Sequence, residues 1–223
     1  MNYAIAIDGP AGAGKSTIAK VLAKELSLIY VDTGALYRTV GYYTTGRGIA
    51  LEDIEGITAA LDDLTVELKY VDGVQRVFAN GEDVSDLIRT PAISMAASAV
   101  SAIPAVRNYL LNTQRSIAAA NSVVMDGRDI GTVILPDAKV KIFLTASPES
   151  RARRRYDELQ AKGDPATYEE VLSDMIKRDY DDSHRAAAPL KQADDAVLVD
   201  TSGDTLEQSV ARIKAVVLKK LAE

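Results

Sequence analysis

The most informative segment of the chain is Gly9-Pro10-Ala11-Gly12-Ala13-Gly14-Lys15-Ser16-Thr17, because it fits the pattern G-x-x-x-x-G-K-[ST]. It follows an apolar run at 3–7 and opens an amphipathic helical pattern over 15–26. Glycines let the backbone curl so that successive N–H groups face phosphate oxygens, and Lys15 adds a positive charge at the β and γ positions. Ser16 offers its hydroxyl to Mg²⁺. We therefore predict a nucleotide-binding loop at residues 9–17.

Length and composition favour one cytoplasmic domain. The 223 residues, 47% of them hydrophobic, can fill a sizeable core. No apolar run approaches the roughly 20 residues that span a bilayer, and we expect no leader and no membrane partner. The absence of cysteine excludes disulfides and cysteine-ligated zinc, and the single His184, expected to be a solvated helix residue, excludes a histidine metal cluster. The net charge of −6 argues against nonspecific nucleic-acid binding, and we expect a monomer.

Apolar runs of strand length alternate with helical patterns along most of the chain, which predicts a doubly wound parallel α/β sheet. The strand runs are 4–7, 28–31, 122–125, 140–144 and 196–199. The helical patterns are 15–26, 91–101, 104–120, 148–162, 167–185 and 205–221, several of which begin with proline.

One region breaks this alternation. Residues 65–70 and 75–79 largely alternate apolar and polar side chains around Asp72-Gly73, and Asn80-Gly81 follows. We predict an antiparallel insert at about 63–89, attached as a small subdomain at the edge of the core. The alternative is a surface hairpin without a functional role.

Two segments that follow predicted strands indicate a second anion site. After the second strand, Thr33 is expected at a helix N-cap, with Arg38 about one and a half turns further on. After the third strand come Asp126, a strand-end carboxylate suited to organising Mg²⁺, and then Arg128 and Asp129. The alternatives are a capped helix with a solvated arginine, and an ion pair between the neighbours Arg128 and Asp129.

Two helices carry further arginines. Arg178, Asp182 and Arg185 have the spacing i, i+4 and i+7 of one helix face, which suits either a phosphate-and-sugar site or a surface salt-bridge ladder. Four arginines also gather at the start of another helix, and their mutual repulsion predicts either a lid over nucleotide phosphates or pairing with Asp157 and Glu158. These four are Arg151, Arg153, Arg154 and Arg155.

Together these segments resemble the bacterial cytidylate kinases of the nucleoside monophosphate (NMP) kinase group, nearly from end to end. The segments that carry the resemblance are GPAGAGKST, DTGALYR, DVSDLIRTP, MAAS, IPAVR, DGRDIGTVILPDAKVKIFL and HRAAAPL. The resemblance implies a three-layer α/β P-loop fold with a five-stranded parallel sheet, an NMP-binding domain enlarged by the hairpin insert, and a short lid. It also implies transfer of the γ-phosphoryl group of ATP, with Mg²⁺, to CMP or dCMP.

The resemblance implies one kinase domain over residues 1–223. Its core would be 1–32, 105–147 and 190–223, its NMP-binding region 33–104, and its lid with flanking helices 148–189. Residues 9–17 would hold ATP, and Ser16 would bind the metal, with Asp126 acting through water. Among the departures from relatives, Thr33 stands where many have serine, and Ser16 stands where some have glycine.

The resemblance also assigns the acceptor site. Thr33, Arg38 and Arg128 would face the acceptor phosphate; Ser98, Arg107 and Asp129 would read cytosine; Arg178, Asp182 and Arg185 would lie near the sugar and phosphate, with Asp182 on the ribose hydroxyls. The expected catalytic residues are Lys15, Arg128, Arg185, Arg151 and Arg155. Two alternatives remain, namely a kinase for another small acceptor such as UMP, AMP, GMP or shikimate, and a nucleotide-dependent switch, although no Asn-Lys-x-Asp motif occurs.

Overall fold

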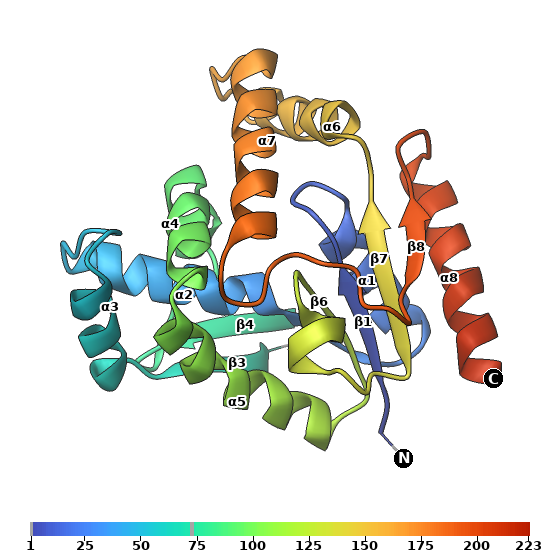
Figure 1. Cartoon of the computed structure of the whole chain (residues 1–223), viewed down its shortest axis with the longest axis horizontal. Coiled ribbons are helices and arrows are strands. Elements are labelled where there is room, and N and C mark those ends of the chain that lie inside the picture. Colours follow the sequence, from blue (N-terminus) through green and yellow to red (C-terminus); the bar gives the residue numbers. More distant parts are fainter. Residues whose placement is uncertain (1, 72–73) are drawn as a thin grey trace. The chain divides into compact units, whose positions relative to one another are not determined.

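The computed structural model describes residues 2–71 and 74–223, which form two compact units (Figure 1). The loop unit comprises the described residues up to Tyr30 together with Asn121–Glu223. The insert unit comprises Val31–Ala120. The predicted turn at Asp72-Gly73 lies outside the described residues. Within the part of the chain that is described, no helix is both long and apolar enough to cross a membrane.

A five-stranded parallel sheet has the order β2-β6-β1-β7-β8, so the α/β fold predicted from the sequence is confirmed. β1 lies in the centre, with Asp8 opposite Gly127 of β6 and opposite Phe143 of β7. Each strand follows its predicted run to within one or two residues. The strands are β1 Ala4–Asp8, β2 Ile29–Asp32, β6 Val123–Gly127, β7 Val140–Thr145 and β8 Val197–Asp200.

Helices α1 and α8 cover this sheet within one apolar cluster. Ile18 and Leu22 of α1 and Ile213 of α8 are fully or almost fully buried in the same cluster as Ile5 and Ile142 of the sheet. Burial of such side chains contributes roughly 1.5–3 kcal/mol each, which fixes the start of α1 against the sheet. The helices and turn of this unit are α1 Lys15–Glu25, η3 Ile130–Ile134, α6 Pro148–Gln160, α7 Tyr168–His184 and α8 Leu206–Ala222.

The insert unit joins helices to a small antiparallel sheet of order β3-β4-β5. Val66 and Val77 of this sheet are buried in the same cluster as Leu36 of α2 and Leu110 of α5, so the insert shares the core of its unit rather than forming a separate subdomain. Its elements are α2 Thr33–Gly46, α3 Ile54–Ala60, η1 Leu61–Asp63, β3 Val66–Val71, β4 Val74–Ala79, β5 Glu82–Asp83, η2 Leu87–Arg89, α4 Pro91–Ser101 and α5 Pro104–Ala120.

Helices α6 and α7 pack against each other through a small apolar cluster of their own. Ala152 and Leu159 of α6 are buried against Val171 and Met175 of α7. A capping box formed by Thr167 and Glu170 starts α7. The helical pattern predicted from residue 167 therefore begins at the N-cap of this helix. The division into core, NMP-binding region and lid given above is a functional one and stays a prediction.

Candidate active site

The phosphate-binding loop connects β1 to α1, and its first glycine is required by its surroundings. Gly9 has a φ of 147°, and a Cβ built on it would lie 1.9 Å from the backbone carbonyl oxygen of Leu144. No side chain fits there without moving β7. Gly14 is the N-cap of α1, adopts a left-handed conformation and makes no side-chain cap. The N–H groups of the first helical turn have no intrahelical partner, and such groups bind anions at the start of a helix.

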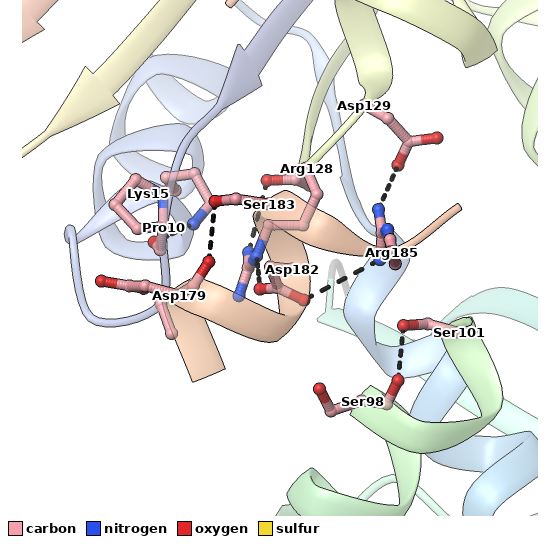
Figure 2. A network of polar contacts seen from close by, with 12 residues as sticks. Pro10, Lys15, Ser98, Ser101, Arg128, Asp129, Asp179, Asp182, Ser183 and Arg185 are labelled. Carbon is pink, nitrogen blue, oxygen red and sulfur yellow. Dashed lines mark hydrogen bonds and ion pairs between the residues drawn. The ribbon is translucent and has the colours of Figure 1, made fainter. Parts of the chain in front are cut away.

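Lys15 is almost completely buried at the start of α1, with 6% of its surface exposed. Its ammonium group donates a hydrogen bond of 2.6 Å to the carbonyl oxygen of Pro10, inside the loop (Figure 2). Burial lowers the pKa of Lys15 well below its ordinary value, and the nearby Arg128 lowers it further. The carboxylates of Asp126, Asp182 and Asp8 act in the opposite direction. The loop therefore holds its lysine in a strongly charged environment.

The hydroxyl group of Ser16 donates a hydrogen bond of 2.8 Å to the carboxylate of Asp126. Asp126 lies in β6, next to the central strand, and 5% of its surface is exposed. A hydroxyl and a carboxylate oxygen are hard ligands of the kind that Mg²⁺ takes beside phosphate oxygens and water. The two predicted metal-site residues therefore lie together, and their chemistry fits a magnesium ion bound with nucleotide.

Asp182 is the centre of a charged network that joins α7 to the loop after β6 (Figure 2). Arg128 donates to its carboxylate at 2.7 Å, and Arg185 lies 3.8 Å from its other oxygen. Arg185 also lies 3.6 Å from the carboxylate of Asp129. Burial alone would raise the pKa of Asp182, but Arg128, Arg178 and Arg185 together hold it below its ordinary value. Two arginines and two aspartates thus form one buried cluster.

The predicted helical column of Arg178, Asp182 and Arg185 is wrong in one respect. α7 ends at His184, and Arg185 has an extended backbone with ψ of 141°. The reason is local, because Arg185 Nε donates to the carbonyl oxygen of Ala188 and the N–H of Leu190 donates to that of Asp182. Arg185 reaches Asp182 from the segment after the helix. His184 is exposed, as predicted, and stacks on Tyr180.

The four arginines of α6 have partners within the protein. Arg151 is buried and donates to the carbonyl oxygens of Ala146 and Ala11, and also to Asp179 of α7 at 3.1 Å. The other three arginines contact separate groups, so carboxylates, carbonyl oxygens and aromatic rings reduce the repulsion among the four guanidinium groups. Arg153 lies over the ring of Tyr168, Arg154 donates to the carbonyl oxygen of Thr201, and Arg155 pairs with the predicted partner Glu158 at 3.2 Å.

In the insert unit, the N-cap of α2 is Asp32 rather than the predicted Thr33. The Asp32 carboxylate accepts from the N–H of Ala35 at 2.9 Å, which places Thr33 in the first turn. The same carboxylate pairs with Arg38 at 2.9 Å and with Arg89 at 3.0 Å. An aspartate caps a helix as well as threonine does, and here it also attracts two guanidinium groups. The predicted Arg38 is therefore anchored rather than solvated.

The remaining predicted residues of the insert unit, Ser98 and Arg107, are linked through Ser101. The hydroxyl of Ser101 donates to the carbonyl oxygen of Ser98 at 2.8 Å, and Arg107 donates to the carbonyl oxygen of Ser101 at 3.1 Å. Arg107 also lies over the ring of Tyr37, 5.5 Å from its centroid. These contacts hold the Arg107 side chain, and the backbone of Ser98, at the junction of α4 and α5.

Comparison with known proteins agrees with this arrangement. The family model described as "Cytidylate kinase" matches residues 5–219. The chain belongs to the cytidylate kinase family. It is 51% identical over 216 residues to the cytidylate kinase of Carboxydothermus hydrogenoformans, covering 97% of each chain. It is 53% identical to that of Caldanaerobacter subterraneus subsp. tengcongensis, covering 96% of this chain and 94% of the other.

Among solved structures, an uncharacterized protein from Eubacterium ventriosum has a TM-score of 0.51 at 14% identity and covers 97% of this chain and 99% of its own. That likeness concerns the fold alone. The resemblance to cytidylate kinases inferred from the sequence motifs is thus confirmed by the family model and by the curated relatives.

Four polar residues of this cytidylate kinase family member were not predicted from the sequence. They are Asp8, which accepts backbone hydrogen bonds from the loop after β6; Asp32, which caps α2; Arg89, which shares Asp32 with Arg38; and Asp179, which binds Arg151. Asp8 ends an apolar strand run directly before Gly9, and this position could have identified it as a residue of the site. The partners of Arg89 and Asp179 are distant in sequence, so these two residues had no such signal.

Proposed function

We propose that this chain is a (d)CMP kinase, which transfers the γ-phosphoryl group of ATP to CMP or dCMP and yields ADP and the nucleoside diphosphate. The observation that carries the proposal is the arrangement of charged groups in the loop unit. Lys15 and Ser16 begin α1, Ser16 donates to Asp126 at 2.8 Å, and Arg128, two residues after Asp126, donates to Asp182 at 2.7 Å. A phosphoryl donor and a phosphoryl acceptor need adjacent positive groups of this kind.

In this proposal the ATP phosphates lie on the main-chain N–H groups of residues 9–17, with Lys15 beside the β- and γ-phosphates. Ser16 and Asp126 would hold Mg²⁺, with Asp126 acting through water. The metal ion, when bound with ATP, would neutralise charge that develops on the phosphate oxygens. The 2.8 Å hydrogen bond between Ser16 and Asp126 supports this assignment.

We propose that the acceptor phosphate contacts Arg128 and Arg185 of the loop unit. For the insert unit, Thr33 and Arg38 stay predicted phosphate-binding residues. Asp182 then accepts from ribose hydroxyls beside Arg178. The buried network around Asp182 supports these roles, since it holds the guanidinium groups in fixed directions before the acceptor arrives. Such preorganisation reduces the repulsion between the two polyanionic substrates without further rearrangement.

The proposed base-reading residues are Ser98, Arg107 and Asp129. Cytosine presents an amino donor at N4 and acceptors at N3 and O2, so Asp129 accepts from N4 while Arg107 donates to the acceptors. Uracil would direct O4 toward the Asp129 carboxylate and N3–H toward Arg107. The mismatch leaves buried polar groups badly paired, which costs about 1–3 kcal/mol or more.

Catalysis in this proposal needs alignment rather than a strong base, because the acceptor phosphate already carries nucleophilic oxygens. Arg151 and Arg155 complete the proposed catalytic set with Lys15, Arg128 and Arg185. The hydrogen bond from Arg151 to the carbonyl oxygen of Ala11 supports a role for this arginine beside the loop. Closure of the lid and insert on double occupancy would exclude water, and amide hydrogen exchange should slow when both substrates are bound.

The acceptor is tested directly by a coupled ADP-release assay with CMP, dCMP, UMP, AMP, GMP and shikimate. We expect CMP and dCMP to give the highest kcat/KM and ATP turnover without an acceptor to be negligible. Turnover that does not depend on any acceptor would instead indicate a nucleotide-dependent switch. A monomeric state, a cytoplasmic location and the lack of nucleic-acid or membrane partners remain predictions.

Base reading is tested by Asp129→Ala, assayed with CMP and UMP. We expect kcat/KM for CMP to fall by roughly 10²-fold, whereas kcat/KM for UMP should change far less, because only cytosine offers N4–H to the carboxylate. Glu25→Ala, which removes an exposed carboxylate paired with Lys214, serves as the control. Equal losses for the two acceptors would refute the base-reading role of Asp129.

A further inference from the structure

Asp8 is the last residue of β1 and is bonded directly to Gly9 of the phosphate-binding loop. Only 5% of its surface is exposed. Its two carboxylate oxygens each accept a hydrogen bond of 2.7 Å, one from the N–H of Ile130 and one from the N–H of Gly131. One side chain thus connects the strand that enters the nucleotide loop to a segment more than a hundred positions later.

The segment that Asp8 holds directly follows Arg128 and Asp129. Ile130–Ile134 forms a single π-helical turn, whose N-cap residue is Asp129. The side chain of Asp129 makes no capping hydrogen bond, although an aspartate at this position commonly caps its own turn. Asp8 supplies the acceptors instead. The carboxylate of Asp129 is thereby directed elsewhere, and Arg185 lies 3.6 Å from it.

The turn leaves little room for a side chain at Gly131. A Cβ on Gly131 would lie 3.1 Å from Cδ of Lys141 and 3.4 Å from Oδ2 of Asp8. The amide of Gly131 can therefore approach the carboxylate closely, with the Lys141 side chain packed over the same position. The charges that act on Asp8 are Asp129, which raises its pKa, and Lys15, which lowers it.

We propose that Asp8 is a positioning residue for CMP recognition: its two backbone hydrogen bonds fix the segment 128–131 and thereby the positions of Arg128 and Asp129. This inference rests on the proposed function, since it concerns how the acceptor is bound. Asp8 acts through Arg128 and Asp129 and is not itself assigned a contact with substrate.

The test uses Asp8→Asn, which keeps the size of the side chain but turns one acceptor into a donor that faces an N–H group. We expect the Kd of CMP, measured by calorimetry, to rise at least fivefold, and the KM of CMP to rise with it. The Kd of ATP should stay within twofold, because the loop backbone binds it. Glu25→Gln, which removes an exposed carboxylate paired with Lys214 in the same unit, is the control and should change neither.

A rise in the Kd of CMP below fivefold, or an equal rise for both nucleotides, would overturn the proposal. Amide hydrogen exchange of the wild-type protein provides a measurement that needs no variant. The N–H groups of Ile130 and Gly131 should exchange slowly before CMP is added, and rapid exchange would contradict the positioning role. If the wild-type protein failed to bind CMP, the proposed function would fail instead, while the exchange result would still report on the Asp8 contacts.

Discussion

Asp8 of the loop unit and Asp32 of the insert unit are both buried aspartates at the end of a strand, yet their pKa values are shifted in opposite directions. Each ends a strand of the parallel sheet, and each is almost fully buried, with 5% and 4% of its surface exposed. Burial raises the pKa of Asp8 to about 6, although two backbone N–H groups lower it. Burial acts on Asp32 as well, but Arg38, Arg89 and the N–H of Ala35 hold its pKa below the ordinary value.

The difference shows what each kind of partner can offset. At Asp8, two peptide N–H groups compensate only part of the cost of removing the carboxylate from water, whereas at Asp32 two guanidinium groups and one peptide N–H together outweigh that cost. The charge of Asp8 therefore weakens the folded state at neutral pH, and the charge of Asp32 stabilises it. A buried charge that costs stability is expected where it serves a functional arrangement, and this agrees with the role proposed for Asp8.

The largest effect is expected for Asp32→Ala, which leaves two guanidinium groups without their shared carboxylate and uncaps α2. We expect the free energy of unfolding to fall by about 3–5 kcal/mol in urea titrations. The control is Asp53→Ala, because the Asp53 carboxylate caps α3 in the same way, by accepting from the N–H of Gly56. This substitution should cost only about 1 kcal/mol. Equal losses would mean that the arginines add nothing to the cap.

A smaller effect concerns the pH dependence of stability. Folding raises the pKa of Asp8 from 3.8 to about 6. The contribution of its protonated carboxyl group to the free energy of unfolding is therefore fully present below pH 3.8 and is lost as the pH rises through 6. The wild-type protein should therefore lose about 3 kcal/mol relative to Asp8→Asn between pH 3.8 and pH 7. Relative to Asp32→Asn it should lose nothing in that window, because the folded pKa of Asp32 lies below 3.8. Urea titrations across this range that gave parallel curves for wild type and Asp8→Asn would contradict the comparison.

The smallest effects test the same contrast within helix α6. Asp179→Asn weakens the pairing of the buried Arg151 and should cost about 1.5–3 kcal/mol. Glu158→Gln weakens the pairing of the more exposed Arg155 and should cost less than about 0.5 kcal/mol. Thermal unfolding of the two variants side by side measures the difference. If both variants unfolded at the same temperature, the buried ion pair of Arg151 would stabilise the protein no more than the exposed pair of Arg155.

Most of the fold could be predicted because its signals are local. The apolar runs predicted β1 and β7, and prolines at the first turn predicted the start of α4 and α5. The seven-residue α3, Ile54–Ala60, was not predicted, because it is too short to show helical periodicity. The turn at Ile130–Ile134 was also missed, since its capping group, Asp8, comes from a distant strand.

The candidate site was predicted less completely than the fold. Motif spacing identified Ser16 and Asp126, and the structure brings them within hydrogen-bond distance. Spacing also indicated Asp182 and Arg185, but it could not show that the helix ends before Arg185. Ion pairs such as that between Arg151 and Asp179 depend on how two helices pack, and a single sequence carries no direct signal for that.

A calorimetric titration of the purified protein with CMP tests the acceptor site most directly. We expect saturable binding of one CMP per chain below millimolar concentration, weakened by Arg128→Met, which removes a guanidinium from the network around Asp182. If no binding heat appeared up to millimolar CMP, this protein would not combine its phosphate-binding loop with an arginine-lined acceptor site.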